Sequence, residues 1–285
     1  MNKLGAKLNE IIESKSILGI VCATINNDEI ETISLGTSNG TKECTPDTRY
    51  DVASLTKIFV TIRIFQLIDD RKINLDTKVN SIISEFENES ITISDLLLHR
   101  SGMMPSVRTR YKLSGDKLKN YIYSMNDYID NQYGTTVYSC INYVLLGEII
   151  ERIDNKLDLS LEENIFKPLG MTNTSFNGLN AAPTELLEDG SIIQERVHDQ
   201  TSFALGGVSG NAGIFTTLND MILFVKGLLN KKIISSNTIE LMESTNIGER
   251  SYWWNRFNEK NWYYSGSTGP LPFINFENNR ALRIL

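Results

Sequence analysis

Strand-like apolar segments lie near both ends of the chain, while helical patterns fill most of its middle. The strand candidates are short apolar runs bounded by polar turns, at 17–25, 29–35, 262–265, 272–276 and 281–285. Between these two groups, from about 61 to 175, apolar residues recur mainly at helical spacing. This order predicts one antiparallel sheet built from both ends of the chain, with a helical domain inserted between them.

Two domains are expected from this order. Residues 1–60 and 200–285 are expected to form a discontinuous α/β sheet domain, which begins with an amphipathic helix at 2–14. Residues 61–199 are expected to form a mainly helical domain. The fold class is therefore α/β, of the α+β kind. Sites often lie between domains, so we expect an active-site cleft between these two.

The most informative local pattern is a serine and a lysine three residues apart, Ser54 and Lys57. A strand-like segment at 50–53 precedes them and an apolar helical run at 58–68 follows. Positions i and i+3 lie on one face of a helix, so the hydroxyl and the amine can meet. A serine needs an adjacent base to become a nucleophile, and a lysine can be that base if its neutral form is accessible. Free N–H groups at a helix start also suit a developing oxyanion.

This pattern alone is common, and it usually marks a helix cap beside a solvated lysine. A second copy, from Ser114 to Lys117, lies in a polar stretch with a glycine inside it and is expected to be a loop. Lys57 differs because it begins an element with a broad apolar face, where a buried lysine is costly without a purpose. We therefore take Ser54 and Lys57 as candidate catalytic residues.

Composition and missing motifs argue against several other classes of protein. The net charge of −7, with no basic stripe, argues against nucleic acid as a main partner. No apolar run approaches about 18 residues, so no membrane-spanning helix is expected. The chain has no G-x-S-x-G, G-x-G-x-x-G or P-loop motif. With only His99 and His198 and no H-E-x-x-H, the sequence also argues against a zinc hydrolase.

The three cysteines are Cys22, Cys44 and Cys140, and they have no metal-ligand spacing. Their odd number fits reduced intracellular thiols better than a disulfide framework. The N-terminal pattern is that of an amphipathic helix rather than a signal peptide. A cytoplasmic location is therefore expected.

Taken in order, five segments of the chain resemble the penicillin-recognising serine hydrolases, in particular their class C β-lactamase-like branch. The segments are D-V-A-S-L-T-K at 51–57, L-L-L-H-R-S-G-M at 96–103, Y-S-C-I-N-Y at 138–143, L-G-G-V-S-G-N-A-G-I-F at 205–215 and G-S-T-G at 266–269. This branch includes D,D-peptidases and family VIII esterases. The resemblance implies the serine β-lactamase/transpeptidase-like fold, in which an antiparallel sheet flanked by helices joins a helical domain.

The resemblance also implies roles for single residues. Ser54 is expected to attack a carbonyl carbon and become acylated, while Lys57 and Tyr138 shuttle its proton, with no metal and no cofactor. A phenol acts as a base only if its pKa falls below the usual value of about 10, and Lys57 is the cation expected to lower it. In the family, the positions of His99 and His198 are structural or line the edge of the cleft.

Substrate contacts implied by the resemblance fall on Cys140, Ser267, Thr268 and Gly269. Cys140 replaces an asparagine, whose amide can both donate and accept, whereas a thiol does both weakly. Ser267 replaces a lysine or histidine that helps to hold a substrate carboxylate. Binding of penicillins or D-Ala-D-Ala termini is therefore expected to weaken, although Thr268 could still contact a substrate.

Two further departures lie near the C-terminus. Pro270 stands where the family residue donates an N–H to the oxyanion hole, and proline has no N–H. Losing one such donor typically costs about 10²–10³ in rate. Relatives also continue past the last strand into a helix that covers the sheet, whereas this chain stops at Leu285. A truncation, or a partner such as a second copy that covers the open sheet, is expected to explain this difference.

These observations predict a serine acyl hydrolase that cleaves an ester or amide of a small molecule or short peptide. Carboxylesterase or peptidase-like activity is favoured over efficient β-lactam hydrolysis. The alternative is a catalytically degenerate homologue that keeps the fold as a binding or regulatory module, which Cys140, Ser267 and Pro270 favour. The presence of Ser54 and Lys57 together with Tyr138 favours the enzyme.

Overall fold

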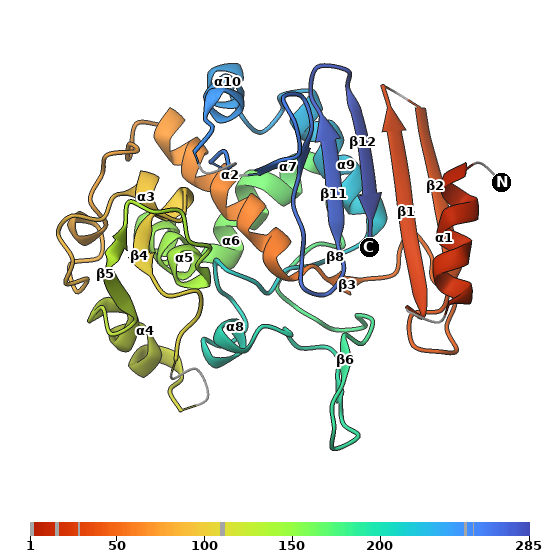
Figure 1. The fold of residues 1–285 in the computed structure, drawn as a ribbon, viewed down its shortest axis with the longest axis horizontal. Helices are drawn as coiled ribbons and strands as arrows, with labels where there is room; N and C mark the ends of the chain where they lie inside the picture. Colours follow the sequence, from red (N-terminus) through yellow and green to blue (C-terminus); the bar gives the residue numbers. More distant parts are fainter. Residues whose placement is uncertain (1–2, 15–16, 28, 109–111, 248–249, 253) are drawn as a thin grey trace.

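Six strands from the two ends of the chain form one antiparallel sheet in the computed structural model, which describes residues 3–14, 17–27, 29–108, 112–247, 250–252 and 254–285 (Figure 1). The spatial order of the strands is β2-β1-β12-β11-β10-β9. They are β1 (Gly19–Asn26), β2 (Glu29–Gly36), β9 (Asn255–Arg256), β10 (Trp262–Tyr263), β11 (Leu271–Asn275) and β12 (Arg280–Ile284). The last strand, β12, therefore lies inside the sheet between β1 and β11. The predicted antiparallel sheet made from both chain ends is confirmed.

Different helices cover the two faces of this sheet, because side chains alternate along each strand. On the inner face, Val21 belongs to the main core, and α9 (Leu218–Leu229) packs against β1 and β12. On the outer face, Cys22 packs with Leu8 of α1 (Lys3–Glu13) in a second, smaller cluster. Figure 1 shows α1 lying beside β1 and β2 at one side of the molecule. The helix α1 covers part of this outer face and leaves the rest of it uncovered.

The helices of the middle of the chain surround α2 (Thr56–Asp69), which is buried along nearly its whole length. Its neighbours include α5 (Cys140–Asp154), α6 (Leu157–Leu161) and the π-helical turn η3 (Glu162–Phe166). The other helical elements are η1 (Ala53–Leu55), η2 (Val79–Ser81), α3 (Ile93–Leu97), α4 (Gly115–Tyr123), α7 (Lys167–Leu169), α8 (Gln200–Ala204) and α10 (Ser236–Ser244). Three small strand pairs are β3 (Tyr50–Asp51) with β8 (Phe215–Thr216), β4 (Ser101–Met103) with β5 (Tyr128–Tyr133), and β6 (Glu185–Leu186) with β7 (Ile192–Ile193).

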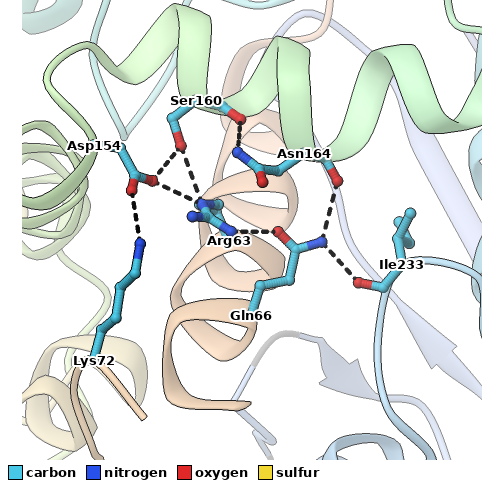
Figure 2. A network of polar contacts seen from close by, with 7 residues as sticks. All are labelled: Arg63, Gln66, Lys72, Asp154, Ser160, Asn164 and Ile233. Atoms are coloured by element: carbon cyan, nitrogen blue, oxygen red, sulfur yellow. Dashed lines mark hydrogen bonds and ion pairs between the residues drawn. The ribbon is translucent and has the colours of Figure 1, made fainter. Parts of the chain in front are cut away.

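A buried polar network holds α2 to the helices around it (Figure 2). The side chain of Arg63 on α2 is nearly inaccessible, and its Nε donates to Asp154 at 2.9 Å and to Ser160 at 3.1 Å. One turn away, Gln66 accepts from Arg63 and donates to the backbone carbonyl of Ile233 at 2.9 Å. A buried arginine is stable only when its donors are satisfied. The network therefore fixes the position of the helix that directly follows the 3-10 turn η1, which carries the candidate nucleophile Ser54.

The second S-x-x-K copy is not a loop, because Ser114 occupies the N-cap position of α4 and Lys117 lies in its first turn. The helix period of the residues that follow, with Leu118 and Ile122 buried, outweighs the glycine inside the motif. The helix expected at 2–14 is present as α1, and residue 2 lies outside the described part.

In the described ranges, no helix is long and apolar enough to cross a membrane. The domain boundaries near 60 and 200 stay a prediction.

Candidate active site

The backbone that leads into Ser54 bends sharply and is held by specific contacts. β3 pairs with β8, and Ala53 then adopts a left-handed conformation with φ of 46°. A residue with a Cβ rarely adopts this conformation unless its surroundings impose it. Here the buried Asp51 carboxylate accepts the Ala53 N–H at 2.7 Å. The bend turns the chain from strand to helix and leaves the Ser54 side chain partly accessible at the helix start.

The Lys57 amine is fully buried and lies between two oxygen acceptors. Its Nζ is 3.1 Å from Ser54 Oγ and 2.7 Å from the carbonyl oxygen of Asn211. The predicted meeting of Ser54 and Lys57 on one helix face is therefore present. At this distance the amine can exchange a proton directly with the serine hydroxyl.

Tyr138 completes the group from the chain just before α5. Its hydroxyl lies 3.0 Å from Ser54 Oγ, and its ring stacks on His99 with a centroid distance of 4.7 Å. Burial raises the pKa of the Tyr138 phenol above its usual value of 10, and the nearby Cys140 adds to the rise. The expectation that Lys57 lowers this pKa is wrong, because the loss of water around the phenol dominates. The phenol is therefore protonated near neutral pH.

The carbonyl that accepts from the lysine belongs to Asn211, in the glycine-rich segment at 205–215, and Asn211 is not among the predicted site residues. The buried Asn211 side chain accepts from Ser209 at 2.7 Å and donates to Asp199 at 2.9 Å. A Cβ on Gly210 would lie 2.0 Å from the Tyr143 carbonyl oxygen, so only glycine lets the loop approach α5 this closely. The glycine-rich stretch signals this close approach, but it does not identify the carbonyl that faces the lysine.

The two histidines have different surroundings. His99 is buried, its Nδ1 accepts the Ser139 N–H at 3.1 Å, and no hydrogen-bond partner for its Nε2 is found among the described residues. Burial, with the positive charges of Arg250 and Lys57, holds the pKa of His99 well below its usual value. Its ring is therefore neutral and supports the Tyr138 ring. His198 instead lines a pocket, and its Nε2 lies 2.7 Å from Glu185.

The third motif forms a tight turn between β10 and β11. The Gly266 N–H donates to the Pro270 carbonyl at 2.9 Å, and the Gly269 N–H donates to the Gly266 carbonyl at 3.1 Å. The Thr268 hydroxyl donates to the carbonyl oxygen of Asp51 at 2.7 Å, so it anchors the turn to the strand before the nucleophile. Ser267 is exposed.

These contacts limit which backbone groups can bind an oxyanion. Gly269 has already donated its N–H, and Pro270 has none. No acceptor for the Ser54 N–H is found among the residues that the structure describes. The Ser54 N–H is therefore the candidate donor beside the nucleophile.

A pocket of about 450 Å³ reaches Cys140, two residues after Tyr138, although Ser54, Lys57 and Tyr138 are not among its lining residues. Cys140 and Ser267, two predicted substrate contacts, line it together. The other lining residues come mostly from the β6–β7 hairpin and the chain leading into α8: Ser106, Glu185, Leu187, Ile193, Arg196, His198, Asp199, Gln200 and Thr201. Thr268 lines a separate pocket of about 230 Å³ with Asp51, and Gly269 lines neither. The predicted substrate residues therefore divide between two surfaces of the same turn.

Over the described ranges, no cluster of three or more histidine, cysteine, aspartate or glutamate side chains has the arrangement of a metal site.

The sequence model of the family described as beta-lactamase matches residues 4–276. An N-acetylmuramyl-L-alanine amidase of Bacillus subtilis (strain 168) is 31% identical over 224 residues, which are 65% of this chain and 50% of that relative. The chain thus spans about half the length of this curated relative.

Solved structures share the fold at lower identity. A class C beta-lactamase from Rhodobacter sphaeroides superposes with a TM-score of 0.83 at 16% identity, over 100% of this chain and 93% of the other. An octameric penicillin-binding protein homologue from Pyrococcus abyssi gives a TM-score of 0.81 at 20% identity, over 100% of this chain and 73% of the other. The predicted serine β-lactamase-like fold is confirmed.

Proposed function

The chain belongs to the beta-lactamase family, and on this premise we propose that it is a serine hydrolase that forms an acyl-enzyme on Ser54. One observation carries the proposal: the Lys57 amine and the Tyr138 hydroxyl both lie within hydrogen-bond distance of Ser54 Oγ, at 3.1 and 3.0 Å. A nucleophile with two proton-transfer groups at this distance is what acyl transfer requires.

In the proposed reaction, Ser54 Oγ forms a bond to the substrate carbonyl carbon and gives its proton to Lys57. The Ser54 N–H stabilises the oxyanion. Tyr138 is protonated, so it gives its proton to the leaving group as the bond to the leaving group breaks, and it regains a proton from Lys57. A water molecule then attacks the acyl-enzyme with the same proton transfers in reverse, which releases the acid and restores Ser54.

The substrate class follows from the pocket and from the replaced residues. We propose that the substrate is an ester or amide of a small molecule or short peptide. Part of this substrate lies in the 450 Å³ pocket, next to Cys140 and Ser267. The serine at 267 carries no charge, which supports ester or peptide cleavage over efficient β-lactam hydrolysis. The amidase relative supports an amide as one form of the scissile bond.

Hydrolysis of a panel of aryl esters by wild type and Ser54→Ala tests the proposal. Ser114→Ala is the matched control, because it removes the exposed serine of the second S-x-x-K copy. We expect Ser54→Ala to abolish turnover and Ser114→Ala to retain it. Full activity in Ser54→Ala would contradict the proposal.

A second candidate is a binding module that keeps the fold without turnover. The turn at 266–270 favours it, because neither Gly269 nor Pro270 offers a free N–H to an oxyanion. This candidate predicts that a peptide or ester binds wild type and Ser54→Ala equally and is never cleaved.

Assembly and location are further parts of the proposal. The Phe257, Tyr263 and Phe273 rings lie together at the uncovered outer face of the sheet, with ring centroids 6.4 Å apart for Phe257 and Tyr263 and 5.4 Å apart for Phe257 and Phe273. Phe257 is 66% exposed. We propose that a second copy of the chain covers this aromatic patch, and the octameric homologue supports assembly in this family. The three free cysteines support a reducing compartment, the cytoplasm.

A further inference from the structure

A buried tyrosine outside the predicted site residues lies next to the proposed catalytic group. Tyr264 follows directly after β10 and is only 3% exposed. Its backbone N–H donates to the carbonyl oxygen of Pro272 in β11 at 3.2 Å. Its ring packs edge-on against the buried Trp254 ring, with ring centroids 6.5 Å apart. The sheet therefore holds the backbone of Tyr264, and the core holds its ring.

The direction of the Tyr264 side chain follows from the alternation of side chains along a strand. Trp262 and Tyr264 are both buried, and the strand pairing continues to Gly266, whose N–H donates to the Pro270 carbonyl at 2.9 Å. A Cβ on Gly266 would lie only 2.7 Å from the carbonyl oxygen of Val52. The face of the strand that carries Tyr264 is therefore packed against the segment that leads into the nucleophile.

The Tyr264 hydroxyl is a buried polar group without a well-formed hydrogen bond. No partner of good geometry is found for it within the part of the chain that the structure describes. An unpaired buried hydroxyl lowers stability, and a phenylalanine would fill the same space without this loss. Packing alone therefore does not account for the hydroxyl.

Electrostatic interactions place this hydroxyl beside that of Tyr138. Burial raises the pKa of Tyr138, and the Ser54 and Tyr264 hydroxyls oppose the rise as hydrogen-bonding groups. Burial also raises the pKa of Tyr264 well above its usual value, and Tyr138 adds to this rise, whereas the charges of Lys57 and Arg250 oppose it. The guanidinium carbon of Arg250 is 5.4 Å from the centre of the Tyr138 ring. Tyr264 therefore keeps its proton and can act on Tyr138 as a hydrogen-bond donor.

We propose that Tyr264 is a positioning residue that donates a hydrogen bond to the Tyr138 oxygen while Tyr138 gives its proton to the leaving group. As the Tyr138 O–H bond breaks, negative charge grows on this oxygen, and a donor already in place binds it more strongly. Tyr264 keeps its own proton throughout, and Lys57 returns a proton to Tyr138. The bond is poorly formed before the reaction and tightens in the transition state, so it lowers the barrier. This inference rests on the proposed hydrolase function.

The leaving group of the substrate tests the inference, because only a weakly acidic leaving group needs a proton from Tyr138. Benzyl acetate and para-nitrophenyl acetate share an acyl group, but benzyl alcohol is a far weaker acid than para-nitrophenol. For Tyr264→Phe, we expect kcat/KM to fall about tenfold or more with benzyl acetate, since a hydrogen bond to a charged group is lost. With para-nitrophenyl acetate, kcat/KM should change little. An equal fall with both esters would show a general structural effect and overturn the inference.

Tyr123→Phe is the matched control. Tyr123 is also buried, its hydroxyl donates to Glu148 at 2.8 Å, and it lines a different pocket. The ratio of the two kcat/KM values in this variant should equal that of wild type. Thermal unfolding of Tyr264→Phe should give a Tm no lower than that of wild type, because the hydroxyl that is removed has no well-formed bond. A lower Tm together with slower turnover of both esters would assign the hydroxyl to stability and overturn the inference.

A double-mutant cycle shows whether Tyr264 acts through Tyr138. In the Tyr138→Phe background, Tyr264→Phe should leave kcat/KM for benzyl acetate unchanged, because the oxygen that receives the hydrogen bond is absent. Effects of the two substitutions that multiply would overturn the inference and leave the proposed function standing. Absence of Ser54-dependent turnover of both esters in wild type would instead contradict the proposed function, and the inference would fall with it.

Discussion

Ser54 and Tyr138 are 84 residues apart in the sequence, yet their oxygens lie 3.0 Å apart. The Asn211 carbonyl that accepts from Lys57 is 154 residues from the lysine. The two oxygen acceptors of Lys57, on Ser54 and Asn211, come from separate parts of the fold. Because both acceptors are in place, a fully buried lysine can be accommodated at a helix start. The chemistry of the site therefore depends on single atoms brought together from three segments.

Replacement of Tyr138 by phenylalanine should separate proton transfer from packing. Tyr138→Phe keeps the ring that stacks on His99 but removes the hydroxyl that contacts Ser54. We expect kcat to fall by about 10²–10⁴ with little change in thermal stability. Steady-state kinetics and thermal unfolding of the purified variant measure both. A variant with wild-type kcat would show that Tyr138 is not the proton donor.

The pH dependence of wild type gives a related test. Because burial raises the pKa of Tyr138 above 10, the phenol keeps its proton at pH values where an ordinary tyrosine begins to lose it. As the acid of the reaction, Tyr138 should therefore cause no loss of kcat up to about pH 10. A fall in kcat below pH 10 that disappears in Tyr138→Phe would contradict this assignment.

Pro270 offers a test by gain of function. Pro270→Ala restores an N–H at the position where the family donates to the oxyanion. Because one oxyanion donor is typically worth about 10²–10³ in rate, we expect kcat to rise by at least about tenfold. Kinetics with a neutral aryl ester measures the change. An unchanged kcat would mean that the restored N–H does not reach the oxyanion and that the Ser54 N–H acts with another donor.

At the scale of elements, the network around Arg63 holds α2, the end of α5 and α6 together (Figure 2). Although burial alone would raise it, the hydrogen bonds from Arg63 and Ser160 hold the pKa of Asp154 below its usual value. A carboxylate with a depressed pKa stabilises the fold fully above its unfolded pKa and loses that contribution as the pH falls through the folded value. The network should therefore weaken in acid.

Removal of the Asp154 side chain should lower the free energy of unfolding at neutral pH. Asp154→Ala leaves the buried Arg63 without its charge partner, for which we expect a loss of about 3–5 kcal/mol in the free energy of unfolding. Lys72→Ala is the control, because Lys72 is half exposed and its amine lies 3.6 Å from Asp154. This substitution should lower the free energy of unfolding by less than about 1 kcal/mol. Urea denaturation measures both, and the difference between Asp154→Ala and wild type should shrink below about pH 4. A difference that is equal at neutral and acid pH would contradict the role of the ionised carboxylate.

The sequence predicted elements better where the apolar pattern was long. The apolar run after Ser54 predicts α2, and the strand patterns predict β1 and β12, because each is an apolar segment of the length expected for its element; α2 is buried along nearly its whole length and β1 is buried on both faces. Ser114 to Lys117 was predicted as a loop but begins a helix, since a single glycine is a weaker signal than the periodic residues after it. The Asn211 and Arg250 contacts could not be predicted, because they depend on backbone geometry and on long-range packing that no local pattern encodes.

At the scale of the whole molecule, the sheet brings both chain ends together and leaves an aromatic patch on its outer face. Phe273→Glu places a charge in that patch without touching the inner core, where Ile274 is buried. If a second copy covers the patch, wild type should be oligomeric and Phe273→Glu monomeric by size-exclusion chromatography with light scattering. A monomeric wild type at micromolar concentration would contradict the proposed assembly.

The central claim is that Ser54 is an activated nucleophile, and intact-mass spectrometry after incubation with a fluorophosphonate probe tests it most directly. The account predicts one covalent adduct on wild type and on Ser114→Ala, and none on Ser54→Ala. A parallel incubation with a penicillin should give less adduct than the fluorophosphonate, because the third motif carries Ser267. No adduct on wild type, or an adduct that persists in Ser54→Ala, would contradict the account.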